Sequence, residues 1–371
     1  MGSVNRTNGG ANVLALRSHN TALVLDLLRG AGPEGVSRLE LADRTGLTPQ
    51  AVSKITARLK DQGLATEAGH RASTGGKPRT VLRLVPAAGH AVGVHLDRDG
   101  LRALLVDLTG GVLAERRASV DLGAGSEEVL RAVTGEVERL VGETLEGATS
   151  SRALSDTASL LGVGIALPGP LDHHHGILHR VTGFPEWNGF PLRTALEERL
   201  GVPVAVDKDT NAAALALAVA GRGSDTTSFA YLHLGTGLGA GLVLDGNVHR
   251  GARTAAGEFG HQVIHLDGPP CTCGNHGCIE TLCLAAVADG SVEEAARVLG
   301  VGAANLVGLL DIDEVLLGGR TVLSWPEVFA GGVSTVLRER AGEVPVTVVS
   351  DGIAEGAAQL LLGPVFGRRD A

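Results

Sequence analysis

The chain has 371 residues, of which 44% are hydrophobic and 2% aromatic, so it is long enough for two or three domains whose cores Leu, Val and Ala must fill. We find neither an apolar run long enough to cross a bilayer nor a secretory start, so we expect a soluble, cytoplasmic protein. The net charge of −9 is uneven, because residues 1–90 carry 12 Lys and Arg against 6 Asp and Glu while the remainder carries 20 against 35. A basic head on an acidic body indicates that only the head meets a polyanion.

The N-terminal head is predicted to be helical after a short tail. Residues 1–18 are rich in Gly, Asn and Ser and are expected to be disordered, whereas residues 19–29 carry leucines at helical spacing. The sequence Ser37-Arg38-Leu39-Glu40 is a capping box, in which the Ser hydroxyl and the Glu carboxylate satisfy free amides at a helix start. Thr48-Pro49 then starts a second helix, with Thr as N-cap and Pro in the first position, that runs to Leu59.

Two helices joined by a short turn are typical of a helix-turn-helix, whose second helix enters the major groove of DNA. Gln50 near the start of that helix is suited to reading a base edge, and the later polar side chains are suited to holding phosphates. Strands predicted at 64–67 and 80–84 flank a basic, glycine-rich loop that suits a minor groove. A winged helix-turn-helix is therefore predicted over residues 19–85, and the alternative is a helical hairpin used for protein contacts. The predicted DNA-binding residues are Thr48, Gln50, Ser53, Lys54, Arg58, Gly76, Lys77 and Arg79.

The body from about residue 86 onward alternates strands, helices and glycine turns, which indicates an α/β architecture. Residues 91–96 and 101–108 are expected to form a hairpin, and a glycine-rich loop is expected at 235–241. Further strands are predicted at 161–167, 202–206, 229–234 and 315–317, with a strand and turn at 242–246.

A short window of the body contains His261, Cys271, Cys273 and Cys278, with glycines between them. Three thiols and one imidazole make a closed tetrahedral ligand set, so we predict a structural zinc with no position for a catalytic water. The alternative is a set of small buried residues and a surface His. The fourth cysteine, Cys283, is interpreted as a core residue.

The same window has the pattern Glu-x-Gly-His followed by Cys-x-Cys-Gly-x-x-Gly-Cys-x-Glu, from Glu258 to Glu280. This pattern resembles the signature of the ROK family, which contains sugar kinases and transcriptional repressors. The resemblance covers nearly the whole chain and implies a two-lobed, actin-like or hexokinase-like fold with ligand between the lobes. It implies a smaller lobe over 86–205 and a larger lobe with the zinc loop over 206–371, with the C-terminal helix returning to the smaller lobe as an option.

A kinase of this fold needs two glycine loops, because backbone amides must approach the nucleotide phosphates closely. By resemblance to ROK kinases, the first loop would have the sequence Asp-x-Gly-Gly-Thr. This chain instead has His95-Leu96-Asp97-Arg98-Asp99 at that place. Carboxylates at that place repel a polyphosphate, by about 1 kcal/mol or more at a few Å. We therefore expect ATP binding to be lost and the protein not to be an enzyme, with the second loop at 235–241 a structural relic.

By resemblance, the sugar site would use Asp209, Glu258, His261 and Glu280, with backbone near Gly169, and Asp209 would be a vestigial general base. His261 is able to bind zinc through one ring nitrogen and a hydroxyl through the other. Lys208 stands where the family usually has Asn, and it donates but cannot accept. Two roles are open for it: pairing with Asp209 and blocking the site, or selecting an anionic sugar such as a sugar phosphate or uronic acid.

The leading hypothesis is a sugar-responsive repressor that binds a palindromic operator as a homodimer or homotetramer, because two-fold protein symmetry matches two-fold site symmetry. One rival is an active sugar kinase with an added DNA-binding head. Another is a regulator that binds no sugar, with Lys208 filling the site. The tract His173-His174-His175 looks like a metal site, but it follows a Pro-Gly-Pro turn and is interpreted as a solvated loop.

Overall fold

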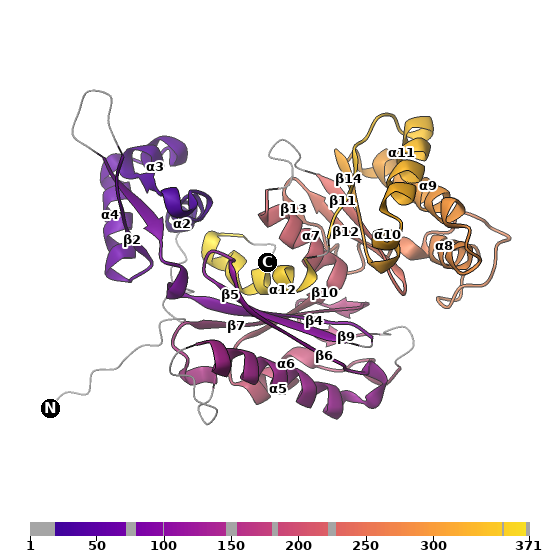
Figure 1. The fold of residues 1–371 in the computed structure, drawn as a ribbon, viewed down its shortest axis with the longest axis horizontal. Helices are drawn as coiled ribbons and strands as arrows, with labels where there is room; N and C mark the ends of the chain where they lie inside the picture. Colours follow the sequence, from indigo (N-terminus) through magenta and orange to yellow (C-terminus); the bar gives the residue numbers. More distant parts are fainter. Residues whose placement is uncertain are drawn as a thin grey trace.

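The computed structural model describes residues 19–71, 79–98, 100–145, 154–179, 185–221, 228–350 and 352–368. It consists of a small N-terminal domain beside a two-lobed body (Figure 1). The tail at 1–18, the tip of the predicted wing with Gly76 and Lys77, and Asp99 lie outside the described residues. No helix in the described ranges is both long and apolar enough to cross a membrane.

The N-terminal domain is a winged helix-turn-helix, as predicted. Both expected caps are present: Glu40 N donates to Ser37 Oγ while Ser37 N donates to the Glu40 carboxylate, and Ala51 N donates to Thr48 Oγ1. The sequence pattern missed a short first strand that completes a three-stranded sheet in the order β1-β3-β2. The elements are α2 (His19–Gly30), β1 (Val36–Ser37), α3 (Arg38–Thr45), α4 (Pro49–Asp61), β2 (Ala65–Arg71) and β3 (Arg79–Leu84).

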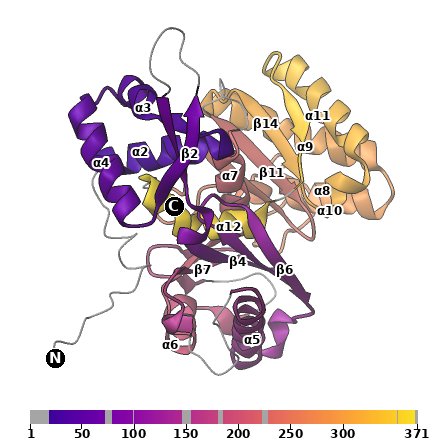
Figure 2. The same ribbon diagram turned by 60° about the vertical axis from the view of Figure 1, so that its left-hand side comes forward.

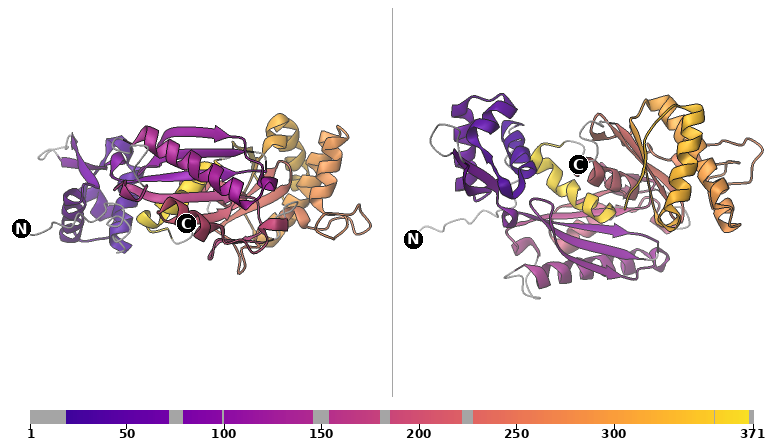
Figure 3. Two further views of the ribbon diagram at one scale, coloured as in Figure 1. Left: turned by 90° about the horizontal axis from the view of Figure 1, so that it is seen from below. Right: turned by 45° about the horizontal axis from the view of Figure 1, so that its top comes forward.

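The first lobe is built on a five-stranded mixed sheet in the order β10-β7-β4-β5-β6. Helices α5 and α6 cover one face, and the C-terminal helix α12 lies on the other (Figure 3). The elements are β4 (His90–Leu96), β5 (Leu101–Asp107), β6 (Val112–Ala118), α5 (Ser126–Thr144), β7 (Leu160–Leu167), α6 (Leu192–Leu200) and β10 (Val204–Lys208), with a small hairpin of β8 (Leu171–Asp172) and β9 (Ile177–Leu178). Strand β10 begins and ends two residues later than the predicted strand at 202–206, so Lys208 is the last residue of the strand.

The second lobe is a five-stranded sheet in the order β13-β12-β11-β14-β15. Helix α7 packs on β11 and β12, and the bundle of α8, α9 and α11 forms the far end of the molecule (Figure 1). The elements are α7 (Asp209–Val219), β11 (Phe229–Leu234), β12 (Leu238–Leu244), β13 (Asn247–Val248), α8 (Ile279–Ala288), α9 (Val292–Leu310), β14 (Glu314–Gly318), α10 (Arg320–Ser324), α11 (Pro326–Arg340) and β15 (Val346–Val348).

Strand β12 corrects the prediction of a glycine loop over 235–241, because the strand already begins at Leu238. The loop is therefore confined to Gly235–Gly237. Gly241 has a packing role instead: a Cβ there would lie 2.1 Å from the backbone oxygen of Thr210 in α7. The glycine-rich sequence looked like one loop because small residues serve both close helix packing and turns.

Helix α12 (Ile353–Leu362) lies between the two lobes. A Cβ at Gly164 of β7 would lie 1.8 Å from Ala357 O, and a Cβ at Gly356 would lie 1.7 Å from Ala212 O in α7. These contacts leave no room for side chains, so the helix packs backbone to backbone against the first sheet on one side and α7 on the other.

The winged-helix domain rests on the end of the C-terminal segment (Figure 2). The Arg29 guanidinium of α2 lies 4.1 Å from the centre of the Phe366 ring, and a Cβ at Gly367 would lie 2.9 Å from Ala22 Cβ. Leu25 and Leu28 of α2 belong to the same buried apolar cluster as Phe366. The winged-helix domain and the body thus share a hydrophobic core.

Candidate functional site

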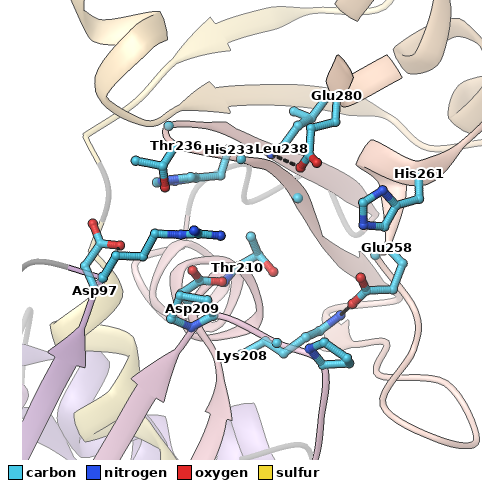
Figure 4. Close-up of a pocket in the computed structure, with 18 of the residues that line it drawn as sticks. Asp97, Lys208, Asp209, Thr210, His233, Thr236, Leu238, Glu258, His261 and Glu280 are labelled. Carbon is cyan, nitrogen blue, oxygen red and sulfur yellow. Dashed lines mark hydrogen bonds and ion pairs between the residues drawn. The ribbon is translucent and has the colours of Figure 1, made fainter. Parts of the chain in front are cut away.

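A cleft of about 1120 Å³ opens between the lobes and is lined by residues of both (Figure 4). Its volume is large enough for a small-molecule ligand. The structure brings together in its walls all six residues predicted for a sugar: Gly169, Lys208, Asp209, Glu258, His261 and Glu280.

Two of the cleft carboxylates are oriented by backbone amides. Asp209 Oδ1 accepts a hydrogen bond from Thr210 N at 2.6 Å, at the start of α7. Glu280 Oε2 accepts one from Leu238 N at 2.8 Å, which ties α8 to the strand that follows the glycine loop (Figure 4). Each carboxylate keeps oxygen lone pairs for other donors, as recognition of a hydroxyl-rich ligand requires.

Lys208 pairs with Glu258 rather than with Asp209, which was the partner in one of the two roles left open for it. Its ammonium donates to Ala256 O at 2.5 Å and to Glu258 Oε1 at 3.1 Å (Figure 4). The side chain is 3% exposed, and its stem crosses Gly169, where a Cβ would lie 2.7 Å from Lys208 Cδ. Glu258 lies 50 residues away in sequence, so only the folded chain could reveal this partner.

A buried ion pair next to the cleft residue Lys208 was missed by sequence reasoning. Arg250 Nε donates to Asp207 Oδ2 at 2.7 Å, and Asn211 Nδ2 donates to Asp207 Oδ1 at 2.9 Å. Asp207 and Arg250 are almost fully buried, and the pair fixes the end of β10 against the loop after β13. In the sequence the pair is visible only as an Asp before Lys208. The spacing of residues cannot identify its partner, because Arg250 lies 43 residues later.

The His173-His174-His175 tract is solvated only in part. His173 Nδ1 lies 2.7 Å from the hydroxyl of the buried Thr254, and burial lowers the pKa of His173 to about 4. His174 and His175 are exposed, and His175 Nδ1 lies 2.7 Å from Asp172 Oδ2. The first histidine therefore joins the β8–β9 hairpin to the second lobe, which the solvated-loop interpretation did not foresee.

The outer part of the cleft contains the degenerate first loop. Asp97 Oδ2 lies 3.8 Å from Arg320 Nη2, so an ion pair connects the first lobe with the start of α10 in the second. His95, Arg98 and the Gly235–Gly237 loop line the same region. Side chains with both charges thus occupy the place where the family's kinases are expected to have glycines.

The predicted metal ligands converge. The ligand atoms of His261, Cys271, Cys273 and Cys278 all lie within 4.8 Å of one another. The closest recorded approaches are 3.7 Å, from His261 Nδ1 to Cys271 Sγ and from Cys273 Sγ to Cys278 Sγ. Three soft sulfurs and one imidazole at this spacing match the donor set and four-fold coordination of a structural zinc.

The thiols of the cluster have unequal acidities before any metal binds. Burial raises the pKa of Cys278 to about 12. Burial also acts to raise the pKa of Cys271, but hydrogen bonds from the Cys273 backbone and neighbouring side chains lower it to about 6. Cys283 lies outside the cluster, fully buried in the core of the second lobe, where its Sγ donates to Ala295 O.

The second helix of the helix-turn-helix, α4, presents Gln50, Ser53 and Lys54 as exposed side chains. Arg58 is also exposed, but its Nη2 donates to Thr21 Oγ1 of α2 at 2.5 Å, so it supports the domain as well as facing solvent. Thr48 caps the helix, and Arg79 is exposed at the start of β3.

Comparison with known proteins agrees with this architecture. The model of the ROK family matches residues 92–287, and that of the MarR family matches residues 18–72. The chain is 26% identical over 347 residues to a protein of Caldicellulosiruptor bescii named xylose repressor, covering 82% of this chain and 84% of that one.

Two similar solved structures come from the two kinds of protein in the family, a transcriptional regulator and a sugar kinase. A ROK family transcriptional regulator described as a homolog of the E. coli MLC protein superposes with a TM-score of 0.74 over 94% of this chain and 97% of its own, and at 24% identity it shows the fold alone. A ROK hexokinase from Thermus thermophilus is 30% identical with a TM-score of 0.58, covering 72% of this chain and 96% of that one. The chain therefore belongs to the ROK family and carries a MarR-type winged helix domain ahead of a two-lobed, actin-like body.

Proposed function

We propose that this protein is a DNA-binding transcriptional regulator, acting as a repressor of sugar-metabolism genes, whose effector is a sugar or sugar derivative bound between the lobes. The observation that carries the proposal is the shared core of α2 and the C-terminal segment, which joins a winged helix to a ligand-sized cleft. The likeness to a protein named xylose repressor supports the same reading.

DNA would be bound through α4, with Gln50 reading a base edge, Ser53, Lys54 and Arg58 holding phosphates, and Thr48 positioning the helix start. The wing, with Gly76, Lys77 and Arg79, would enter the adjacent minor groove. A homodimer or homotetramer on a palindromic operator fits the two-fold symmetry of such sites.

The effector acts only through a difference in its affinity for the DNA-binding and the released conformations. A contiguous route for such coupling begins at Asp209, the first residue of α7. From there it follows α7 to α12 through the Ala212–Gly356 contact, and then Phe366 to Arg29 of α2. Lobe closure around a ligand would move α12 against the first sheet and so tilt the winged helix.

We infer that the protein has no sugar-kinase activity. In the outer cleft, the Asp97–Arg320 pair and the side chains of His95 and Arg98 stand where backbone amides would have to approach phosphates. The rival, an active kinase with Asp209 as base, keeps support from the likeness to a hexokinase. An ADP-release assay over a sugar panel separates the two, because turnover that Asp209→Asn abolishes would establish the kinase.

A structural zinc is proposed for the Cys3His cluster, held by His261, Cys271, Cys273 and Cys278. Bound there, it would fix His261 and the loop that leads into α8, whose first turn holds Glu280 in the cleft. The cluster requires reduced thiols, in keeping with the expected cytoplasmic location.

The decisive test of the regulator is selection of duplexes from a randomised library by the purified protein, followed by affinity measurements with and without sugars. We expect enrichment of a palindromic sequence and a change of its affinity with one class of sugar. Failure to enrich any sequence, in a protein that is folded and monodisperse, would contradict the proposal.

A further inference from the structure

The ammonium of Lys208 lies at the floor of the cleft, held by two protein acceptors. One is the backbone oxygen of Ala256 at 2.5 Å and the other is Glu258 Oε1 at 3.1 Å. An ammonium has three N–H donors. Within the described part of the chain the recorded bonds use two of them, while Lys208 itself lines the cleft.

Glu258 is the accessible member of the pair, with 38% of its side chain exposed against 3% for Lys208. Its Oε1 receives the lysine, which leaves Oε2 as an acceptor at the cleft surface. A donor and an acceptor therefore stand side by side at the floor, and one ligand hydroxyl can accept from the ammonium while it donates to the carboxylate.

The charges around this pair disfavour an anionic group. Among the charged residues that line the cleft, Asp97, Arg98 and Arg320 come from the first loop and α10, and the others are the carboxylates of Asp209, Glu258 and Glu280 and the ammonium of Lys208. Since Lys208 is already paired with Glu258, a ligand carboxylate beside it would also face the carboxylates of Asp209 and Glu280. Like charges at a few Å cost on the order of 1 kcal/mol or more.

We propose that Lys208 is a specificity-determining residue of the effector site, acting with Glu258 as a neutral donor–acceptor pair for a sugar hydroxyl. The pair selects uncharged sugars and rejects sugars with a carboxylate in the inner cleft. This inference rests on the proposed effector function. The proposal replaces the alternative in which Lys208 attracts an anionic sugar, because Glu258 already neutralises the ammonium.

The test is titration calorimetry of the full chain with zinc bound, using D-xylose, D-glucose and N-acetyl-D-glucosamine as neutral probes and D-glucuronate and D-galacturonate as acidic ones. We expect a neutral sugar to bind and the uronates to bind at least about tenfold more weakly. Lys208→Met should weaken the neutral sugar by about tenfold or more, because Glu258 loses its partner and the hydroxyl loses a donor.

Glu258→Gln is the reciprocal variant. It leaves the lysine without a counter-ion, so the preference should shift toward the uronates by about tenfold relative to the unmodified protein. Lys60→Met is the matched control, because Lys60 pairs with Glu67 at 2.6 Å on the surface of the DNA-binding domain and should leave sugar affinity unchanged.

Tighter binding of a uronate than of the neutral sugars by the unmodified protein would overturn the proposal. So would unchanged neutral-sugar affinity in Lys208→Met, or the absence of binding by every probe.

Circular dichroism and a thermal midpoint establish that each variant is folded, and the Lys208→Met/Glu258→Gln double variant recovers folding if the unpaired carboxylate alone is disruptive. Sequence-selective DNA binding is measured in parallel, so a failure at Lys208 is distinguished from a failure of the regulator itself.

Discussion

Arg58 of α4 donates a hydrogen bond to Thr21 Oγ1 of α2 at 2.5 Å, and this bond joins the helix proposed to read DNA to the helix that rests on the body. Thr21 is fully buried, and it is one residue from Ala22, which lies against Gly367 at the end of the C-terminal segment. The orientation of α4 is thereby linked to the position of α12 through a short series of contacts.

Substitution of Arg58 should therefore have two effects. Arg58→Ala removes a partly buried hydrogen bond and should lower the free energy of unfolding by about 1 kcal/mol. It should also weaken DNA binding through the loss of a phosphate contact. Urea unfolding and fluorescence anisotropy on the selected duplex measure the two separately.

Lys54 is the comparison for Arg58, since it is exposed on the same helix. Lys54→Ala should leave stability within about 0.5 kcal/mol. The slope of log affinity against log salt should become shallower by about 1, as expected when one phosphate contact is removed. An unchanged slope would remove Lys54 from the DNA interface.

Replacing Arg29 should uncouple the effector from DNA. The guanidinium lies over the Phe366 ring and also pairs with Asp26 at 2.6 Å. Arg29→Met keeps the aliphatic stem but removes the cation–π contact, worth about 0.5–2 kcal/mol. We expect sugar affinity to persist while the sugar-induced change in DNA affinity shrinks, measured as the ratio of duplex affinities with and without sugar. An unchanged ratio would exclude the Arg29–Phe366 contact from the coupling route.

Removal of one zinc ligand should weaken both metal binding and ligand response. Cys273→Ser replaces a soft sulfur with a hydroxyl, and the cluster keeps three donors. We expect zinc stoichiometry by elemental analysis to fall well below one per chain and the sugar response to be lost. Cys283→Ser is the control for thiol loss, because Cys283 lies outside the cluster. Full zinc occupancy in Cys273→Ser would contradict the assignment.

His173 should make the free energy of unfolding depend on pH in the mildly acidic range. Burial lowers the pKa of His173 to about 4 from the usual 6.5, so the unfolded chain takes up a proton in a pH range where the folded chain does not. Its contribution is present above pH 6.5 and is lost as the pH falls from 6.5 toward 4. His173→Gln should flatten the thermal midpoint over this range, whereas His174→Gln, at an exposed position, should not. A steep pH dependence that survives in His173→Gln would assign the effect to other groups.

The local features of this protein follow from the sequence alone. The capping box at Ser37 and Glu40, the Thr48 cap and the spacing of the cysteines depend on residues close in the chain, so their geometry follows from local rules. The family pattern placed Asp209, Glu258, His261 and Glu280 in one site, and the structure brings all four to the same cleft.

Pairs between side chains that are far apart in the chain become visible only in the folded structure. A pair between Lys208 and its neighbour Asp209 was one of two roles open from the sequence, yet the ammonium reaches Glu258 instead. The Asp207–Arg250 and Asp97–Arg320 pairs, and the shared core of α2 with Phe366, likewise join segments far apart in sequence. Spacing cannot encode such contacts, because they depend on how the lobes, α12 and the winged helix pack once the chain has folded.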